Sequence, residues 1–153
     1  MLHLRSFSTL ALLLCGALHT HAHAQSTTPS MTPKPAAGEG GSVTTASGLI
    51  YRSITEGKGN SPAATDNVKV HYRGTFMDGR EFDSSYTRGK PAVFRLNGVI
   101  KCWTEGVQRM KVGGKAKLSC PAAIAYGEKG TPGGPIPPNA TLNFEVELLA
   151  INP

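Results

Sequence analysis

Six aromatic side chains are the strongest candidates in this sequence for a functional site. They lie where strands and a short helix could bring them to one apolar pocket, and they are Tyr72, Phe82, Phe94, Trp103, Tyr126 and Phe144. No general base or metal set accompanies them. His71 is the only histidine after residue 24, and one histidine with two cysteines does not make a zinc site. We therefore expect a pocket that needs no metal and no cofactor.

Alternating apolar and polar residues predict the strands that would hold these rings. We expect strands over residues 48–56, 68–76, 80–83, 92–96, 115–120 and 142–148, with a hairpin turn at 78–79. Trp103, Val107 and Met110 follow at helical spacing, and residues 113–114, both glycine, should end that helix. One antiparallel sheet with one short helix against its apolar face satisfies this pattern, so the predicted fold class is α+β.

The same alternation places His71 on the polar face of its strand, beside Lys69 and Arg73. A hydrogen-bonded or solvated surface histidine is the interpretation that this position favours. No histidine is then left to serve as the base of a hydrolase.

The N-terminal residues 1–24 have the three parts of a secretory signal peptide. Arg5 is the positive residue, 7–18 are mostly apolar, and Ala22 and Ala24 flank a small-residue cleavage site. We expect cleavage after Ala24 and a periplasmic or secreted protein, without stable membrane insertion. Lipidation at Cys15 is a minor alternative, because Leu14 is not the small residue that usually precedes a lipidated cysteine.

A composition shift separates the rest of the chain into two parts. Residues 25–46 contain hardly any large apolar side chains, so we expect a flexible linker, followed by one domain over 47–153. The formal net charge of the whole chain is +6. Lys111, Lys115 and Lys117 cluster without interleaved aromatic residues, so we expect a solvated strand face and no nucleic-acid partner.

Four short motifs, in order, resemble the FKBP family of peptidyl-prolyl isomerases over roughly residues 47–151. They are VHYRG at 70–74, GREFDSS at 79–85, WTEGV at 103–107 and AYG at 125–127. The resemblance implies a curved antiparallel β-sheet wrapped around one short α-helix, with the ligand pocket between them. It also implies catalysis of cis–trans isomerisation at X–Pro bonds.

The resemblance assigns roles to individual residues. Trp103 would form the pocket floor, and Asp83, Tyr126 and the Ile100 backbone N–H would act on the substrate carbonyls. Arg88 would pair near Asp83. The other substrate-binding positions would be Tyr72, Phe82, Val99, Ala125, Ile136 and Phe144. Taken singly, Phe94 and Tyr72 could equally be core residues.

Two positions depart from the family pattern at the pocket, and one pair of residues adds a covalent possibility. Ala92 stands where many members carry an aromatic wall residue, which could weaken macrolide binding. Cys102 replaces the glycine that usually precedes the floor tryptophan. Export would leave Cys102 and Cys120 as an even pair in an oxidising compartment, so we expect a disulfide. Two buried thiols that simply fill space are the alternative.

The leading function is an isomerase that acts on proline-containing polypeptides among exported proteins. A non-catalytic proline-peptide binding module or holdase chaperone is the alternative, and macrolides are possible inhibitors. Nothing in the sequence resembles the long helical dimerisation arm of larger bacterial relatives, so we expect a monomer.

Overall fold

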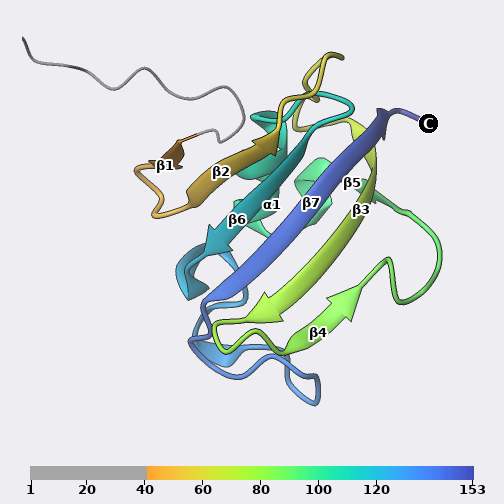
Figure 1. Ribbon diagram of the computed structural model, residues 1–153. Helices are drawn as coiled ribbons and strands as arrows, with labels where there is room; N and C mark the ends of the chain where they lie inside the picture. The colour runs from red at the N-terminus through yellow and green to blue at the C-terminus, as the bar shows by residue number, and fades with distance from the viewer. Residues whose placement is uncertain (1–40) are drawn as a thin grey trace, which may run out of the picture. The chain divides into compact units, whose positions relative to one another are not determined.

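The computed structural model describes residues 41–153, and its dominant element is one antiparallel sheet. The sheet has seven strands in the order β1-β2-β6-β7-β3-β4, with β5 also paired to β3 (Figure 1). The strands are β1 (Ser42–Thr44), β2 (Ile50–Thr55), β3 (Asn67–Phe76), β4 (Glu81–Ser84), β5 (Ala92–Arg95), β6 (Lys115–Cys120) and β7 (Leu142–Ile151). All pairs are antiparallel.

A single α-helix, α1 (Lys101–Gln108), lies behind the sheet in Figure 1, within the described part of the chain. Three 3₁₀ segments accompany it: η1 (Leu96–Gly98), η2 (Ala122–Ile124) and η3 (Gly127–Lys129). The predicted α+β class, with a curved sheet wrapped around one short helix, is confirmed. Over residues 41–153, no helix has the length and apolar character needed to span a bilayer.

The period-two pattern of β3 and β7 explains how the sheet forms a core. The two ten-residue strands pair from Val68 to Phe76 with one irregularity after Lys69, and their inward residues alternate with outward ones. Val70, Val146 and Leu148 are fully buried on the helix side. On the other side Arg73 pairs with Glu81 at 2.7 Å and Lys115 pairs with Glu145 at 2.6 Å. One face is therefore apolar and the other is a network of charges.

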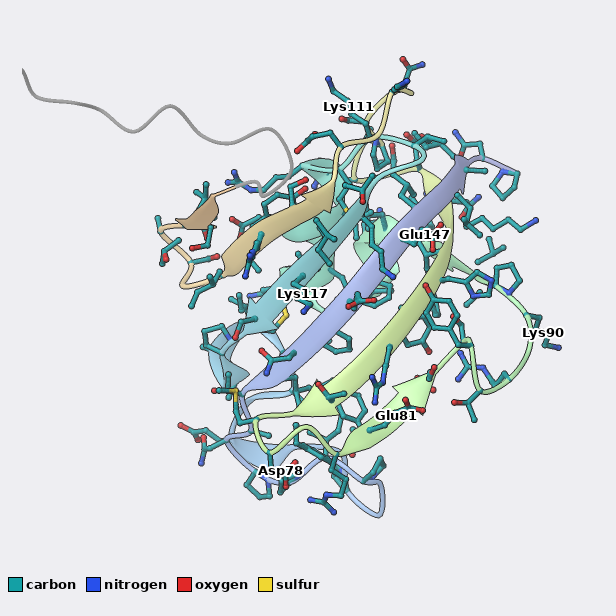
Figure 2. All side chains as sticks on the ribbon, viewed as in Figure 1. Asp78, Glu81, Lys90, Lys111, Lys117 and Glu147 are labelled. Carbon is teal, nitrogen blue, oxygen red and sulfur yellow. A yellow bond between two sulfur atoms is a disulfide. The ribbon has the colours of Figure 1, made fainter. Side chains whose placement is uncertain are left out.

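Figure 2 shows this charged face toward the viewer, with Lys117 and Glu147 on it. His71 lies on the same face, as its position in the strand predicted. Its Nδ1 is 2.9 Å from Ser85 Oγ, and its ring stacks on Tyr86 with centroids 4.6 Å apart. The histidine is thus a hydrogen-bonded structural residue.

Several element boundaries differ from the sequence-based expectation; β7, for example, extends to Ile151 and not 148, and two differences matter most. Strand β1 lies inside the segment 25–46 that was expected to be a flexible linker, because Val43 pairs with Tyr51 of β2 and extends the sheet. The helix ends at Gln108 and not at the glycines 113–114. Its last turn tightens, since the Arg109 N–H donates to Gly106 O and the Met110 N–H to Val107 O. Residues 1–40, including the expected signal peptide and Cys15, lie outside the described residues.

Candidate functional site

A cavity of about 490 Å³ opens between the apolar face of the sheet and the first turn of α1. Strands β3, β4, β5 and β7 contribute to it, as do the segment before the helix and the loop after β6. It is lined by Tyr72, Phe82, Asp83, Phe94, Gly98, Val99, Ile100, Trp103, Tyr126 and Phe144. All six of the aromatic residues singled out in the sequence therefore converge on one cavity.

Trp103 lies at the centre of this aromatic set. Its ring is perpendicular to Tyr72, Phe94 and Phe144, with centroids 5.1, 5.7 and 5.5 Å away. Edge-to-face packing of this kind is favoured by the ring quadrupoles. The indole is 4% exposed, and its buried N–H has no hydrogen-bond acceptor among the described residues. The side chain is thus held by ring packing alone, which makes its position depend on where α1 lies.

Asp83 is the one acidic group on the cavity, and two neighbours hold it. The Tyr72 hydroxyl donates to Asp83 Oδ2 at 2.5 Å, and Arg88 Nη1 donates to Asp83 Oδ1. Arg88 Nη2 also donates to the Tyr72 hydroxyl at 2.8 Å. Burial, followed by the hydrogen bond to Asp83, raises the pKa of Tyr72 above its ordinary value. The phenol therefore stays protonated at neutral pH and remains a donor to the carboxylate.

Besides the indole N–H of Trp103, two further donors on the cavity have no partner in the described chain. The Tyr126 hydroxyl and the Ile100 backbone N–H make no hydrogen bond within residues 41–153. Burial, followed by the charge of Asp83, raises the pKa of Tyr126. Both groups can therefore donate to a carbonyl oxygen that enters the cavity.

Gly74 is a site residue whose role the sequence pattern did not reveal. It occupies an inward position of β3, and a Cβ there would lie 2.6 Å from the Phe82 ring and 3.0 Å from the Phe144 ring. The absence of a side chain lets these rings meet at 5.7 Å, edge to face. A glycine at an inward strand position is the signal that could have predicted such a close approach.

The structure separates the predicted site residues into two groups. Those on the cavity lining are Tyr72, Phe82, Asp83, Val99, Ile100, Trp103, Tyr126 and Phe144. Arg88 lies outside the lining and acts on it through Asp83 and Tyr72. Phe94, whose alternative was a core role, is on the lining, and Gly98 joins it.

Ala125, Ile136 and Ala92 do not line the cavity. Ile136 is 5% exposed and belongs to the core cluster. Its N–H donates to Thr131 Oγ1 at 3.0 Å, and its carbonyl accepts from the Thr131 N–H at 2.9 Å. These bonds close a turn of the loop over residues 131–136. Ala125 and Ala92 are half-buried against the core.

The sequence and the fold were compared with known proteins. A family model described as FKBP-type peptidyl-prolyl cis-trans isomerase matches residues 58–149. The FKBP-type peptidyl-prolyl cis-trans isomerase FkpA of Escherichia coli (strain K12) is 54% identical over 115 residues, which cover 75% of this chain and 42% of that protein. This chain therefore spans less than half the length of that relative.

Solved structures agree with the sequence comparison. The crystal structure of FkpA from Escherichia coli matches with a TM-score of 0.71 and 54% identity, over 74% of this chain and 52% of that chain. A peptidyl-prolyl cis-trans isomerase from Pseudomonas syringae pv. tomato matches with a TM-score of 0.68 and 38% identity, over 79% and 84% of the two chains.

Proposed function

The chain belongs to the family of FKBP-type peptidyl-prolyl cis-trans isomerases, and from this premise we propose that its aromatic cavity isomerises X–Pro bonds of polypeptides. The observation that supports this most is the combination of two unpartnered donors, the Tyr126 hydroxyl and the Ile100 N–H, with a fixed carboxylate on an otherwise apolar cavity. Such a site can hold a proline ring and two carbonyl groups without any covalent step.

The chemistry requires only that the twisted amide be favoured over the planar one. Resonance makes the X–Pro amide planar, with a barrier of about 18–20 kcal/mol to rotation. At the transition state the resonance is lost and the amide becomes less dipolar. An aromatic cavity removes the water that hydrogen-bonds the planar carbonyl, so it penalises the ground state more than the transition state.

The residues then have distinct roles in this proposal. The proline ring packs on Trp103, and the rings around it exclude water. Tyr126 and the Ile100 N–H donate to carbonyl groups and orient the peptide. The Asp83 carboxylate, held by Tyr72 and Arg88, lies beside the rotating carbonyl and interacts with its electropositive carbon without reorganising during the reaction.

A protease-coupled assay on the chain beginning at Gln25 tests the proposal. Uncatalysed isomerisation takes tens to hundreds of seconds, so acceleration is readily measured. Asp83→Leu should lower kcat/KM while circular dichroism shows an intact fold, and Lys117→Ala on the outer face serves as the control. Proline-peptide binding without acceleration by the folded wild type would instead identify the chain as a non-catalytic binding module or holdase.

We also propose that the protein is exported, cleaved after Ala24 and oxidised at Cys102 and Cys120. The pattern of residues 1–24 supports export, and the two cysteine Cα atoms are 5.8 Å apart, within the range that a disulfide spans. Intact-mass measurement should find a chain that begins at Gln25. Titration of the denatured, unreduced protein should find no free thiol, and two free thiols per chain would contradict the bridge.

A further inference from the structure

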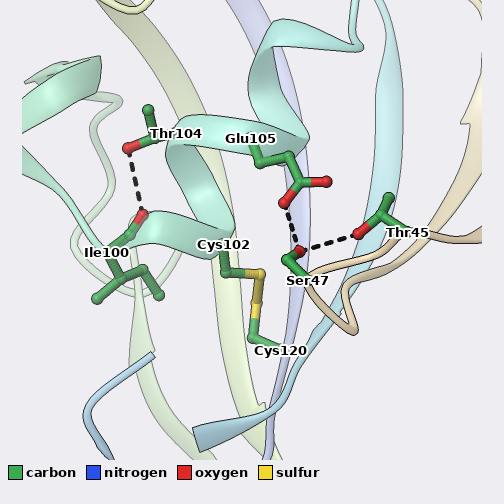
Figure 3. The surroundings of a disulfide bond; sticks show 7 residues. All are labelled: Thr45, Ser47, Ile100, Cys102, Thr104, Glu105 and Cys120. Carbon is green, nitrogen blue, oxygen red and sulfur yellow. Dashed lines mark hydrogen bonds between the residues drawn. A yellow bond between two sulfur atoms is a disulfide. The ribbon is translucent and has the colours of Figure 1, made fainter. Parts of the chain in front are cut away.

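The disulfide between Cys102 and Cys120 joins the first turn of α1 to the last residue of β6 (Figure 3). Both cysteines are fully buried. An eight-residue helix is too short to be stable by itself, so contacts with the sheet must determine where it lies. The position of Cys102, directly before Trp103, places the covalent link at the cavity floor.

A second contact gives the helix a defined register on β6. A Cβ on Gly106 would lie 2.8 Å from the Leu118 side chain, so helix backbone and strand side chain touch there. Four helical residues, from Cys102 to Gly106, advance about 6 Å. Two strand residues, from Cys120 back to Leu118, cover about 6.6 Å. The helix and strand therefore run alongside each other in opposite directions. The disulfide fixes the start of the helix against the end of β6.

The segment that carries the unpaired donor is joined to the same turn. Thr104 Oγ1 donates to the Ile100 carbonyl at 3.4 Å and to the Leu96 carbonyl at 2.7 Å. A displacement of the first helical turn would consequently move the Ile100 N–H and the cavity wall at Val99 together with Trp103.

A polar contact on the solvent side of the helix does not replace the covalent link. Ser47 Oγ donates to Glu105 Oε2 at 2.5 Å and lies 2.9 Å from Thr45 Oγ1 (Figure 3). These groups are exposed, and exposed polar contacts restrain a helix only weakly. The buried disulfide is the stronger restraint on the first turn.

We propose that Cys102 and Cys120 are positioning residues for the isomerase site: their disulfide fixes the register of α1 on β6 and thereby the placement of Trp103 and of the Ile100 N–H. The inference rests on the proposed function for its kinetic consequence. It concerns the geometry of the cavity floor, beyond the stability that a cross-link adds.

The test compares the oxidised chain from Gln25 with two variants that lack the link. Cys102→Ala/Cys120→Ala removes the link and some buried volume, whereas Cys102→Ala/Cys120→Val removes the link and refills the volume. Leu148→Ala is the matched control, because it removes buried volume from β7 outside the cavity lining. All are assayed at a temperature where each melting curve shows a folded protein.

We expect both link-less variants to lose about tenfold or more in kcat/KM, since small misplacements of site groups have effects of this size. Leu148→Ala should retain the wild-type value. Trp103 is the only tryptophan, so its emission wavelength and acrylamide quenching report the floor directly. We expect red-shifted emission and stronger quenching in the two link-less variants only.

The proposal would be overturned if kcat/KM and the Trp103 emission were unchanged in both link-less variants. It would also be overturned if the valine variant, which refills the volume, recovered the wild-type kcat/KM and emission. An inactive oxidised wild type would contradict the proposed isomerase function. The positioning role would then be decided by the Trp103 emission and quenching alone.

Discussion

Two cavities of nearly equal volume lie on opposite faces of the sheet, and strands β3 and β7 contribute to both. The inner one has a volume of about 490 Å³ and is lined mainly by aromatic rings. The outer one has a volume of about 500 Å³, and its lining mixes charged and polar side chains with the apolar Ile50, Leu118 and Phe144. On the outer face Arg73 is paired with Glu81 and Glu145 with Lys115. On the inner face the Tyr126 hydroxyl, the Ile100 N–H and the Trp103 indole N–H are without partners in the described chain. Volume therefore does not distinguish the proposed site from the outer hollow. The cluster of aromatic rings and the unpaired donors do.

One register of strand pairing builds both faces. Gly74 pairs with Phe144, and the adjacent Arg73 pairs with Glu145. Successive side chains of a strand point to opposite faces, so a shift of one residue would exchange the ring wall for the charges. The same β3–β7 register therefore forms both cavities. A substitution on one face can serve as the control for a substitution on the other.

Truncation of the cavity floor should have the largest effect. Trp103→Ala removes a ring that is 4% exposed and should destabilise the protein by about 3–5 kcal/mol. It should also abolish measurable isomerisation, because the proline ring loses its packing surface. Urea unfolding and the coupled assay measure the two effects. Lys117→Ala on the outer face should leave both unchanged, and equal losses in the two variants would contradict the distinction between the faces.

A side chain added on the inner face of β3 should have the next largest effect. Gly74→Ala places a Cβ against Phe82 and should reduce kcat/KM by about tenfold through displacement of that ring. Thr75→Ala, the neighbouring residue on the outer cavity, is the matched control. Near-ultraviolet circular dichroism should show altered ring packing in Gly74→Ala alone. Wild-type kcat/KM in a folded Gly74→Ala would show that the ring contact is dispensable.

Removal of an unpartnered donor should have a smaller effect. Tyr126→Phe should lower kcat/KM by about three- to tenfold, the contribution of one neutral hydrogen bond, with little change in stability. Burial raises the pKa of Tyr126 above the ordinary value of 10.0, so wild-type activity that depends on its proton should stay constant through pH 9 and fall only at higher pH. A pH profile of kcat/KM should show less of that alkaline fall in Tyr126→Phe. An identical fall in both proteins would exclude the hydroxyl.

The smallest effect should come from the outer charges. The hydrogen bond to Glu145 raises the pKa of Lys115 above 10.5. The folded state therefore binds that proton more tightly, and the pair's contribution is present below pH 10.5 and is lost as the pH rises through the folded-state pKa. Glu145→Gln should lower the free energy of unfolding by less than about 1 kcal/mol, because the side chains of Lys115 and Glu145 are both about one-third exposed. Chemical unfolding at pH 7 measures this change in stability, and the kcat/KM of the variant should equal that of the wild type.

Local patterns were sufficient to predict most of the framework. Period-two alternation located β3, β6 and β7. The short motifs identified the family and contain four of the six aromatic residues that meet at the cavity; Phe94 and Phe144 came from the strand pattern. These features depend on residues close in sequence, whose side chains alternate in direction whatever lies across the sheet. The order of the four motifs along the chain supported the family resemblance, and that resemblance assigned the roles of the site residues.

Features that need partners far along the chain were decided by the tertiary structure. β1 exists because β2 offers it a pairing edge, and the helix ends early because its last turn tightens at Arg109. Ile136 lies buried in the core, whereas Phe94 reaches the cavity. Alternation along β6 puts Cys120 on the apolar face. Only the packing of α1 on β6 brings the Cα atom of Cys102 to 5.8 Å from the Cα atom of Cys120. Distances between separate elements arise from packing, and no period in the sequence encodes them.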